Sequence, residues 1–358
     1  MRKAFGSVGK YMARLLLLAQ LCICFSFLLG GCGVGQRSSE KSFFMMDTII
    51  SVRLYCDEET AAPLFEECRK ILEEVENLLS CTIEDSLVSR FNRDGEVRLS
   101  EDMLALWREI RDISEATAGT FDPTVEPLVT LWRSSGEAGR LPTAEEMTAA
   151  LENVGMKHVH ADGDILVRDA SCATRLDLGA VGKGYAIRKV LAFLETTDVP
   201  GGILSFGGNI ATFGGKPDGS AFRVAVRDPA ETNGTLGVLA TESGKVVSVS
   251  GDYERYVEID GIRYHHIVDP ATGYPAEGGL HSVAVICEDP VLADALSTAL
   301  FVMGRERAME FYASGIYTFE AILTDDDTVW LTPGLEGAFS LTGAYNLVKS
   351  GTTEREGR

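Results

Sequence analysis

The chain has 358 residues, of which 45% are hydrophobic and 24% are charged, and this composition is typical of a globular protein. The formal net charge of −20, without any long basic tract, excludes a protein that binds nucleic acid by neutralising its phosphates. A phosphate-bearing ligand would therefore have to be held by backbone amides, a metal ion or a few local cations.

The N-terminus has the layout of a secretory signal. Residues 1–14 are basic and contain no acidic residue, and the short apolar run that follows ends in "LGGC", Leu29 to Cys32. The run is short for a membrane span, which needs about 20 residues. Its end resembles a bacterial lipobox, in which Cys32 would become the lipidated first residue; an uncleaved membrane anchor is the alternative. We expect a signal at residues 1–31, a lipidated tether at 32–41 and a polar tail at 351–358.

The cysteines beyond this segment do not predict a disulfide framework or a zinc site. Their number is odd, and no two are spaced as in a CxxC motif. Cys68 falls on the apolar face of a predicted helix, where burial is the expected role. The remaining ones are Cys56, Cys81, Cys172 and Cys287.

The predicted elements mix helices and strands without strict βαβ alternation, so we expect the α+β class, with no linker dividing the chain. Apolar and β-branched runs between turn signals predict strands at residues 43–56, 164–169, 174–181, 201–215, 221–229, 245–251, 255–269, 281–289 and 321–334. Apolar residues at helical spacing predict helices at 59–80, 100–119, 143–155, 184–197 and 290–304. Ser100 and Thr143 are the expected N-caps of two of them, and Glu146 completes a capping box with Thr143.

A glycine-rich motif, "DLGAVGKGYA", spans Asp177 to Ala186 at a predicted strand-to-helix junction. Glycines at such a junction allow backbone amides to approach a phosphate. The spacing is GxxGxG, which is neither the dinucleotide-binding fingerprint nor a P-loop. A tight turn is the structural alternative, and the flanking Asp177 and Lys183 favour a ligand site.

A second motif, "ADALSTALF", carries Asp294 and Thr298 on an otherwise apolar helix. The two residues are four apart and share a helix face. A buried carboxylate is costly unless it is paired or bound to metal, and two neighbouring oxygen ligands suit Mg²⁺. The alternative is an acid near the helix N-terminus and a threonine bonded to the backbone.

Two further motifs lie next to turns. "YHHIVDPATGYP", Tyr264 to Pro275, places His265 and His266 before a proline and glycine turn, which is either a structural corner or a reactive loop. "GTFDPTVEPLVTLW", residues 119–132, would be an ordinary loop if it stood alone.

Together these motifs resemble the FAD:protein FMN transferases, the ApbE-type lipoproteins. The resemblance covers nearly all of residues 43–347 and keeps the family's order. It implies the ApbE-type fold, with mixed and antiparallel sheets and packed helices in one compact catalytic unit at residues 42–350. The matching blocks are "MMDTIISVRLY", "SLVSRFN", "GTFDPTVEPLVTLW", "DLGAVGKGYA", "FGGNIATFGG", "SGDYERY", "YHHIVDPATGYP" and "ADALSTALFVMG".

The resemblance also implies roles for single residues. It makes His266 the catalytic residue of the reactive loop and leaves His265 a packing or hydrogen-bonding role. An unperturbed imidazole titrates near ~6.5, so the rate is expected to rise with pH through that region. The residues implied to bind FAD are Met46, Thr120, Phe121, Asp122, Asp177, Lys183 and His266. The implied ligands of Mg²⁺ are the backbone carbonyl of Ala180 and the side chains of Asp294 and Thr298.

Some positions depart from the family pattern. Asp47 stands where glycine is usual, Arg188 replaces the usual aspartate, and Thr82 falls where many members offer an aromatic residue to the flavin ring. "SVSGDY" replaces the commoner Thr-Ser-Gly run. These departures concern flavin stacking and affinity more than the metal and histidine positions.

The reaction implied is Mg²⁺-dependent transfer of FMN from FAD to a threonine hydroxyl of an acceptor flavoprotein, with release of AMP. The partners implied are FAD and flavoprotein subunits of membrane electron-transport complexes. A lipid anchor would hold the protein on the bacterial membrane, facing outside the cytoplasm. The chain has no Ser-Gly-Ala-Thr acceptor motif of its own, so self-flavinylation is not expected. The alternatives are a Mg²⁺-dependent FAD diphosphatase and a lipoprotein that binds flavin without chemistry.

Overall fold

The computed structural model describes residues 38–231 and 233–349, which belong to one compact unit. The predicted signal, Cys32, most of the tether and the polar tail lie outside the described residues. The tether was expected to reach Lys41, but the first strand, β1, begins at Ser39, so the folded unit starts earlier than predicted. Within the described ranges, no helix combines the length and the apolar character needed to cross a bilayer.

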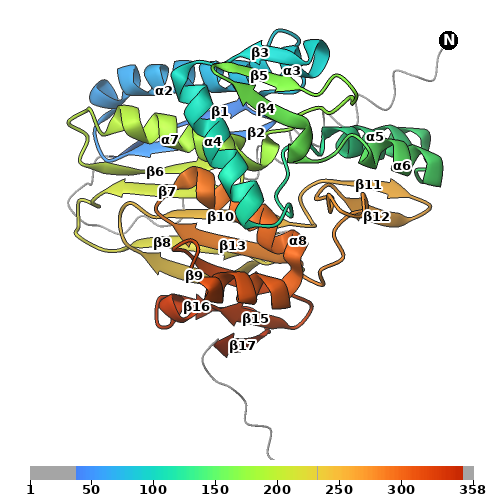
Figure 1. Cartoon of the computed structure of the whole chain (residues 1–358). Coiled ribbons are helices and arrows are strands. Elements are labelled where there is room, and N and C mark those ends of the chain that lie inside the picture. Colours follow the sequence, from blue (N-terminus) through green and yellow to red (C-terminus); the bar gives the residue numbers. More distant parts are fainter. Residues whose placement is uncertain (1–37, 232, 350–358) are drawn as a thin grey trace, which may run out of the picture. The chain divides into compact units, whose positions relative to one another are not determined.

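A nine-stranded sheet forms the centre of the unit (Figure 1). All neighbouring strands are antiparallel except the last two, β15 and β17, which are parallel. In spatial order the strands are β1 (Ser39–Met45), β2 (Thr48–Leu54), β6 (Gly201–Phe206), β7 (Asn209–Gly214), β10 (Val246–Gly251), β13 (Ser282–Cys287), β14 (Glu320–Thr324), β15 (Thr328–Leu331) and β17 (Asn346–Lys349).

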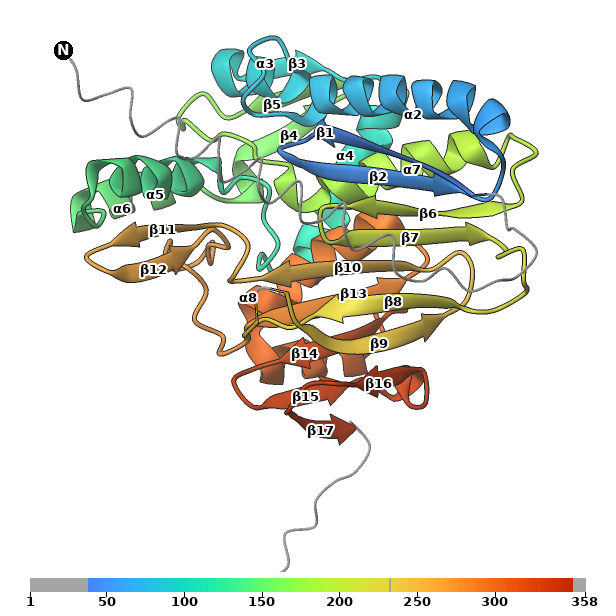
Figure 2. The same ribbon diagram turned by 180° about the vertical axis from the view of Figure 1, so that it is seen from behind.

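The two faces of this sheet are covered differently. Helices pack on one face, and a small sheet of β8, β9 and β16 packs on the other (Figures 1 and 2). The central strand β13 is buried along its whole length because Val283 and Val285 join the helix-side core while Ala284 and Ile286 join the core beneath the small sheet. The covering elements are α2 (Glu58–Leu79), α4 (Glu101–Ala116), α7 (Gly179–Leu194), α8 (Pro290–Ser314), β8 (Phe222–Arg227), β9 (Thr235–Thr241) and β16 (Phe339–Leu341).

Smaller elements complete the unit. A third apolar cluster, which includes Leu128, Trp132 and Val268, joins α5 and α6 to the segment after the β11–β12 hairpin. These elements are α3 (Leu87–Asp94), β3 (Glu96–Arg98), α5 (Glu126–Ala138), α6 (Ala144–Leu151), η2 (Met156–His158), β4 (Val159–Asp162), β5 (Ile165–Arg168), β11 (Tyr256–Ile259), β12 (Ile262–His265) and η3 (Pro333–Leu335). The predicted α+β class is confirmed, as are the N-cap Ser100 and the capping box of Thr143 and Glu146.

Two predicted elements near the site differ from those observed. The single strand predicted at residues 43–56 is a hairpin, because Met46 and Asp47 both adopt positive φ angles, 53° and 57°, and form a two-residue turn. No strand occupies residues 174–181; α7 begins at Gly179, five residues before its predicted start. Both errors have one cause: apolar β-branched runs do not show where the chain reverses or starts a helix unless tertiary contacts are known.

The glycines of the 177–186 motif therefore lie inside a helix, and close packing is one of their roles. A Cβ on Gly184 would stand 2.2 Å from the carbonyl oxygen of Pro290 at the start of α8. A Cβ on Gly182 would meet two flexible side-chain ends, the terminal methyl of Met46 at 3.4 Å and the Cδ1 of Leu79 at 4.0 Å. Gly184 thus lets α7 and α8 approach each other, whereas Gly182 does not carry that constraint.

These two glycines give a matched test of the helix contact. We expect Gly184→Ala to lower the free energy of unfolding by about 1–3 kcal/mol because the backbone of α8 must move away. Gly182→Ala should be neutral or stabilising, since alanine favours a helix by up to about 1 kcal/mol over glycine. Urea unfolding followed by circular dichroism measures both, and an equal loss in the two variants would contradict the assignment.

Candidate functional site

An open pocket of about 1320 Å³ lies beside the central sheet and is larger than most small-molecule sites. The β1–β2 turn, the loop before α5, the start of α7, β10 and the loop after β12 all contribute to its walls. Nine of the predicted site residues line it, although they come from distant parts of the sequence: Met46, Thr120, Phe121, Asp122, Asp177, Ala180, Lys183, His266 and Thr298. Asp294 is not among the lining residues.

His266 follows β12, and its ring is exposed to the pocket. Its Nδ1 lies 3.1 Å from the carbonyl oxygen of Arg255, and its backbone N–H donates to the same oxygen at 3.0 Å. Because a carbonyl only accepts, Nδ1 carries the proton of the neutral ring, and Nε2 keeps a lone pair. Desolvation of the ring by the protein around it lowers the pKa of His266 to about 4, and the nearby cations Arg255 and Lys183 contribute to this shift. The ring is therefore a neutral proton acceptor at physiological pH.

His265 is held in a different environment. Its Nε2 donates to the carbonyl oxygen of Ala276 at 3.1 Å, and its ring meets Phe301 edge-on with the centroids 5.5 Å apart. Its Nδ1 is buried and has no hydrogen-bond partner. Burial lowers the pKa of His265 as well, which keeps the ring neutral. Packing and one hydrogen bond, the role expected for this residue, describe its contacts.

Asp294 is 3% exposed and lies at the centre of a polar network between α8, α7 and the sheet. Its Oδ2 accepts from the backbone N–H of Gly184 at 2.9 Å. Its Oδ1 accepts from Asn209 Nδ2 at 2.8 Å and from Ser248 Oγ at 3.3 Å, and Lys183 Nζ lies 3.4 Å away. Asp294 is the fifth residue of α8, beyond the first turn, so the alternative of an acid at the helix N-terminus is wrong.

The donor atoms of the three residues implied to bind Mg²⁺ are oxygens, the type that a hard divalent cation prefers. The Oγ1 of Thr298 and the carbonyl of Ala180 come from pocket-lining residues, and the Asp294 carboxylate is already compensated by the Lys183 ammonium. A site with one carboxylate, one hydroxyl and one carbonyl suits Mg²⁺, which usually completes its shell with water and phosphate oxygens. Among the described residues, no group of three or more His, Cys, Asp or Glu side chains could hold a metal by itself.

The backbone amides of the glycine motif are less available than the sequence suggested. The N–H groups of Val181 and Gly182 donate to the carbonyl of Leu178, and that of Gly184 donates to Asp294. The N–H of Gly179 donates to Asp177 Oδ1 at 2.7 Å. The motif therefore contributes to the pocket mainly through Lys183 and the Ala180 carbonyl. It offers fewer free backbone amides to a phosphate than the sequence suggested.

Three other residues predicted to bind FAD line the pocket but also make contacts inside the protein. Phe121 lines it but belongs to the helix-side core, and Thr120 is buried with its hydroxyl bonded to the Thr117 carbonyl at 3.0 Å. Asp122 accepts from the amide and hydroxyl of Thr124 at 2.8 and 2.6 Å, while its burial raises its pKa. These residues shape the wall near the start of α5.

Some functional candidates escaped prediction. Asn209 and Ser248 are fully buried and orient Asp294, with Ser248 Oγ donating to Asn209 Oδ1 at 2.8 Å. The available signal was a polar residue inside each apolar strand, "NIATF" and "VVSVS". Glu254 and Arg255 line the pocket beside the histidine loop; the signal for them was their place in the matching block "SGDYERY", to which no role was assigned.

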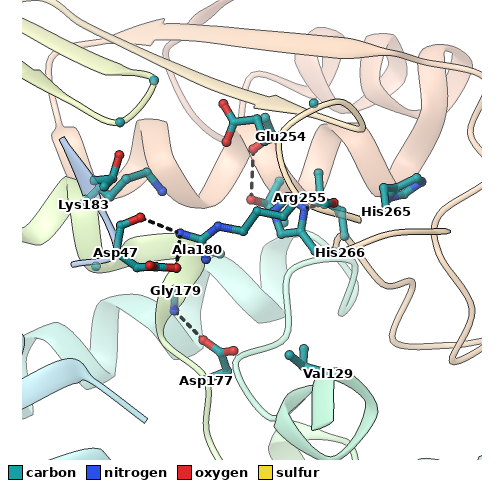
Figure 3. A pocket seen from close by; sticks show the side chains of 18 of the residues that line it. Asp47, Val129, Asp177, Gly179, Ala180, Lys183, Glu254, Arg255, His265 and His266 are labelled. Atoms are coloured by element: carbon teal, nitrogen blue, oxygen red, sulfur yellow. Dashed lines mark hydrogen bonds and ion pairs between the residues drawn. The ribbon is translucent and has the colours of Figure 1, made fainter. Parts of the chain in front are cut away.

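The departures from the family pattern also find places in the structure. Arg188 binds both carboxylate oxygens of Glu109 at 2.7 Å and Asp289 at 2.6 Å, so it joins α4 and α7 to the N-cap of α8. Thr82 is exposed at the pocket wall with its hydroxyl 3.0 Å from that of Ser80. Asp47 pairs with Arg255 across the pocket (Figure 3).

The sequence matches the ApbE family over residues 46–323. The chain belongs to the ApbE family. A relative from Vibrio cholerae, named FAD:protein FMN transferase, is 32% identical over 308 residues, which are 84% of this chain and 92% of the relative. A relative of the same name from Treponema pallidum is 29% identical and covers 80% of this chain and 85% of its own.

A solved structure agrees with this assignment. The apo form of the Pseudomonas stutzeri flavinyl transferase ApbE superposes with a TM-score of 0.74 at 29% identity, over 87% of this chain and 100% of that one. The predicted family and its fold are thereby confirmed. As a member of the ApbE family, the chain is an enzyme of the flavin transferase class, as the sequence predicted.

The different surroundings of the histidines predict different titrations. His281 lies between Asp252 and Asp326, with nitrogen-to-oxygen distances of 2.6 and 2.9 Å. Burial alone would lower its pKa, but these two carboxylates raise it above the ordinary value. In an NMR titration we expect His281 to lose its proton above pH 6.5 and His266 to gain one only near pH 4. His281→Gln and His266→Gln assign the signals, and a His266 midpoint at or above 6.5 would contradict this picture.

Proposed function

We propose that this ApbE-family enzyme transfers FMN from FAD to a threonine hydroxyl of an acceptor protein and releases AMP. The observation that carries the proposal is the neutral His266 in the pocket wall, with Nδ1 bound to the Arg255 carbonyl and Nε2 available as a base. The names of the Vibrio and Treponema relatives support FAD as the flavin donor and a protein as the acceptor.

The residues of the pocket account for the proton and the bonds. His266 Nε2 takes the proton of the threonine hydroxyl, whose oxygen forms a bond to the phosphorus of the FMN half. The bond from that phosphorus to the bridging oxygen breaks, and AMP leaves with the electron pair. Lys183 places a positive charge at the same wall. The protonated imidazole then returns its proton to solvent, which its low pKa favours.

Asp294, Thr298 and the carbonyl of Ala180 would hold Mg²⁺ in this proposal. The ion would neutralise charge on the diphosphate and on the departing AMP. Asn209, Ser248 and the Gly184 amide keep the Asp294 carboxylate in one orientation. Lys183 compensates that carboxylate when no ion is bound.

Incubation with FAD and an acceptor separates transfer from its alternatives. The acceptor is a peptide carrying Ser-Gly-Ala-Thr, and its control has valine in place of threonine. Mg²⁺-dependent transfer is supported if flavin fluorescence stays with the threonine peptide through denaturing electrophoresis. The labelled peptide should not form when chelator is present during the incubation. Free FMN without labelled peptide would show a diphosphatase, and unchanged FAD would show a flavin-binding protein without chemistry.

Replacing His266 tests the proposed base. His266→Ala should lower the rate about 10²- to 10⁴-fold, the usual contribution of a positioned base, while FAD binding survives. The base is active when neutral, and its pKa lies at about 4. The rate should therefore be the same above and below pH 6.5 and should fall only as the pH approaches 4. The fall of the rate in acid is thus expected at a lower pH than the value near 6.5 that the sequence suggested. A normal rate in His266→Ala together with an inactive His265→Ala would reverse the assignment of the pair.

Two substitutions test the metal ligands. Asp294→Asn keeps the shape of the side chain but removes its charge. The Mg²⁺ concentration needed for turnover should therefore rise strongly, or turnover should stop. Thr298→Val should weaken Mg²⁺ binding less, because a neutral hydroxyl contributes less than a carboxylate. Calorimetric Mg²⁺ titration and circular dichroism accompany the rates. Wild-type Mg²⁺ affinity in folded Asp294→Asn would exclude the site.

We also propose that Cys32 carries lipid and holds the enzyme on the bacterial membrane, facing outside the cytoplasm. The support is the sequence alone: a basic segment, an apolar run and "LGGC". Stable anchoring requires two or more acyl chains. Cys32→Ser should release the protein or leave the precursor uncleaved, as fractionation and mass spectrometry would show. Processing and membrane retention equal to wild type would refute the anchor.

A further inference from the structure

An ion pair crosses the pocket between two segments that lie far apart in the sequence. Arg255 Nη2 is 3.2 Å from Asp47 Oδ2, and it also donates to the Asp47 backbone carbonyl at 3.4 Å. Both residues line the pocket, and their side chains are 57% and 79% exposed, so a ligand can reach either one. Figure 3 shows Arg255 extending from beside His266 to Asp47.

Each end of the pair is fixed by its backbone. Asp47 belongs to the β1–β2 turn, where its φ is 57° and the N–H of Met46 donates to Glu76 Oε1 at 2.7 Å. Arg255 supplies the carbonyl that accepts both the N–H and the Nδ1–H of His266. The guanidinium that Asp47 holds is therefore attached to the residue that orients the base.

This placement makes Arg255 suited to the reacting phosphate. A base and the phosphorus it serves are separated by a single hydroxyl group, so a flexible arginine beside the base is within reach of the same phosphate. Guanidinium groups bind phosphate oxygens in a bidentate manner. Of the other cations that line the pocket, Lys183 pairs with Asp294 and Arg227 lies over the ring of Tyr253 at 4.7 Å. Arg133 lies in α5, away from the His266 loop in the sequence.

We propose that Asp47 competes with the diphosphate of FAD for the guanidinium of Arg255, so that Arg255 binds substrate and Asp47 limits the affinity. This rests on the proposed use of FAD in this pocket. Before substrate binds, the carboxylate holds the guanidinium; when the diphosphate enters, it replaces Asp47 as the partner. An exposed ion pair is weak, so the competition should cost roughly two- to sixfold in affinity.

The test is the equilibrium affinity for FAD and for riboflavin, measured by flavin fluorescence in chelator so that no turnover occurs. Riboflavin has the same ring system and no phosphate. The variants are Asp47→Asn, Arg255→Gln and the double variant. Asparagine tolerates the positive φ of the turn, so Asp47→Asn removes charge without adding backbone strain. Asp260→Asn is the matched control because Asp260 also has a positive φ, 52°, in the turn between β11 and β12, and does not line the pocket.

The expected pattern distinguishes competition from other effects. Asp47→Asn should bind FAD roughly two- to sixfold more tightly and riboflavin unchanged. Arg255→Gln should bind FAD about tenfold or more weakly, and Asp47→Asn should bring no gain in that background. Asp260→Asn should match wild type for both ligands.

Several results would overturn the proposal. One is an unchanged FAD affinity in Asp47→Asn, and another is an equal increase in its riboflavin affinity. The others are an increase in FAD affinity that persists in the Arg255→Gln background, or the same increase in Asp260→Asn. In these cases wild-type binding of FAD leaves the proposed function intact. Absence of FAD binding in wild type and every variant, with Mg²⁺ as well as in chelator, would instead remove both the proposed function and this inference.

Discussion

The site depends on one constraint: a carboxylate, Asp294, is buried in the middle of the unit. A buried charge is tolerated only with hydrogen bonds and a compensating cation. The structure provides these from three directions, with the Gly184 amide from α7, Asn209 from β7 and Ser248 from β10. The carboxylate is thereby held beside Lys183, which lines the pocket, although Asp294 itself is not a lining residue. The close contact of α7 and α8 at Gly184 makes the first of these bonds possible.

The same reasoning explains why two adjacent histidines differ. Successive residues at the end of β12 point to opposite sides. His265 turns toward the core, where Phe301 and the Ala276 carbonyl hold it. His266 turns toward the pocket, where the Arg255 carbonyl fixes its tautomer. A single hydrogen bond to a backbone oxygen thus decides which nitrogen is basic, and desolvation of the ring, helped by the neighbouring cations, lowers its pKa so that the ring stays neutral.

An acidic protein that handles an anionic substrate must concentrate its few cations. Lys183 and Arg255 both belong to the pocket wall; Lys183 is paired with the buried Asp294, and Arg255 is paired with Asp47, which lines the pocket. Such pairs compensate charge while the pocket is empty and leave the cations in reach of a phosphate. In the competition proposed for Arg255, a carboxylate of the protein and the diphosphate of the substrate bind the same cation. Arg188 illustrates the other use of a cation, since it joins three helices away from the pocket wall.

The family and the α+β class follow from the sequence alone, which also singled out nine of the residues that line the pocket. The motifs around His266, Asp294 and Lys183 are local patterns, and a local pattern is readable without knowing how the chain folds. The capping box of Thr143 and Glu146 was predictable for the same reason, since it involves residues three apart. The long amphipathic helix α2 was also predictable, because its apolar spacing extends over many turns.

The contacts between distant segments become visible in the folded structure alone. Asp47 and Arg255 are 208 residues apart, and although each lies in a matching block, neither block shows that the two residues pair. The bonds of Asn209 and Ser248 to Asp294 arise because β7, β10 and α8 pack together. The glycines of the 177–186 motif looked like a phosphate loop, yet Gly184 is needed because α8 lies against it. Residue type and spacing show which chemistry is available, whereas hydrogen bonds, burial and close packing depend on which surfaces the fold brings into contact.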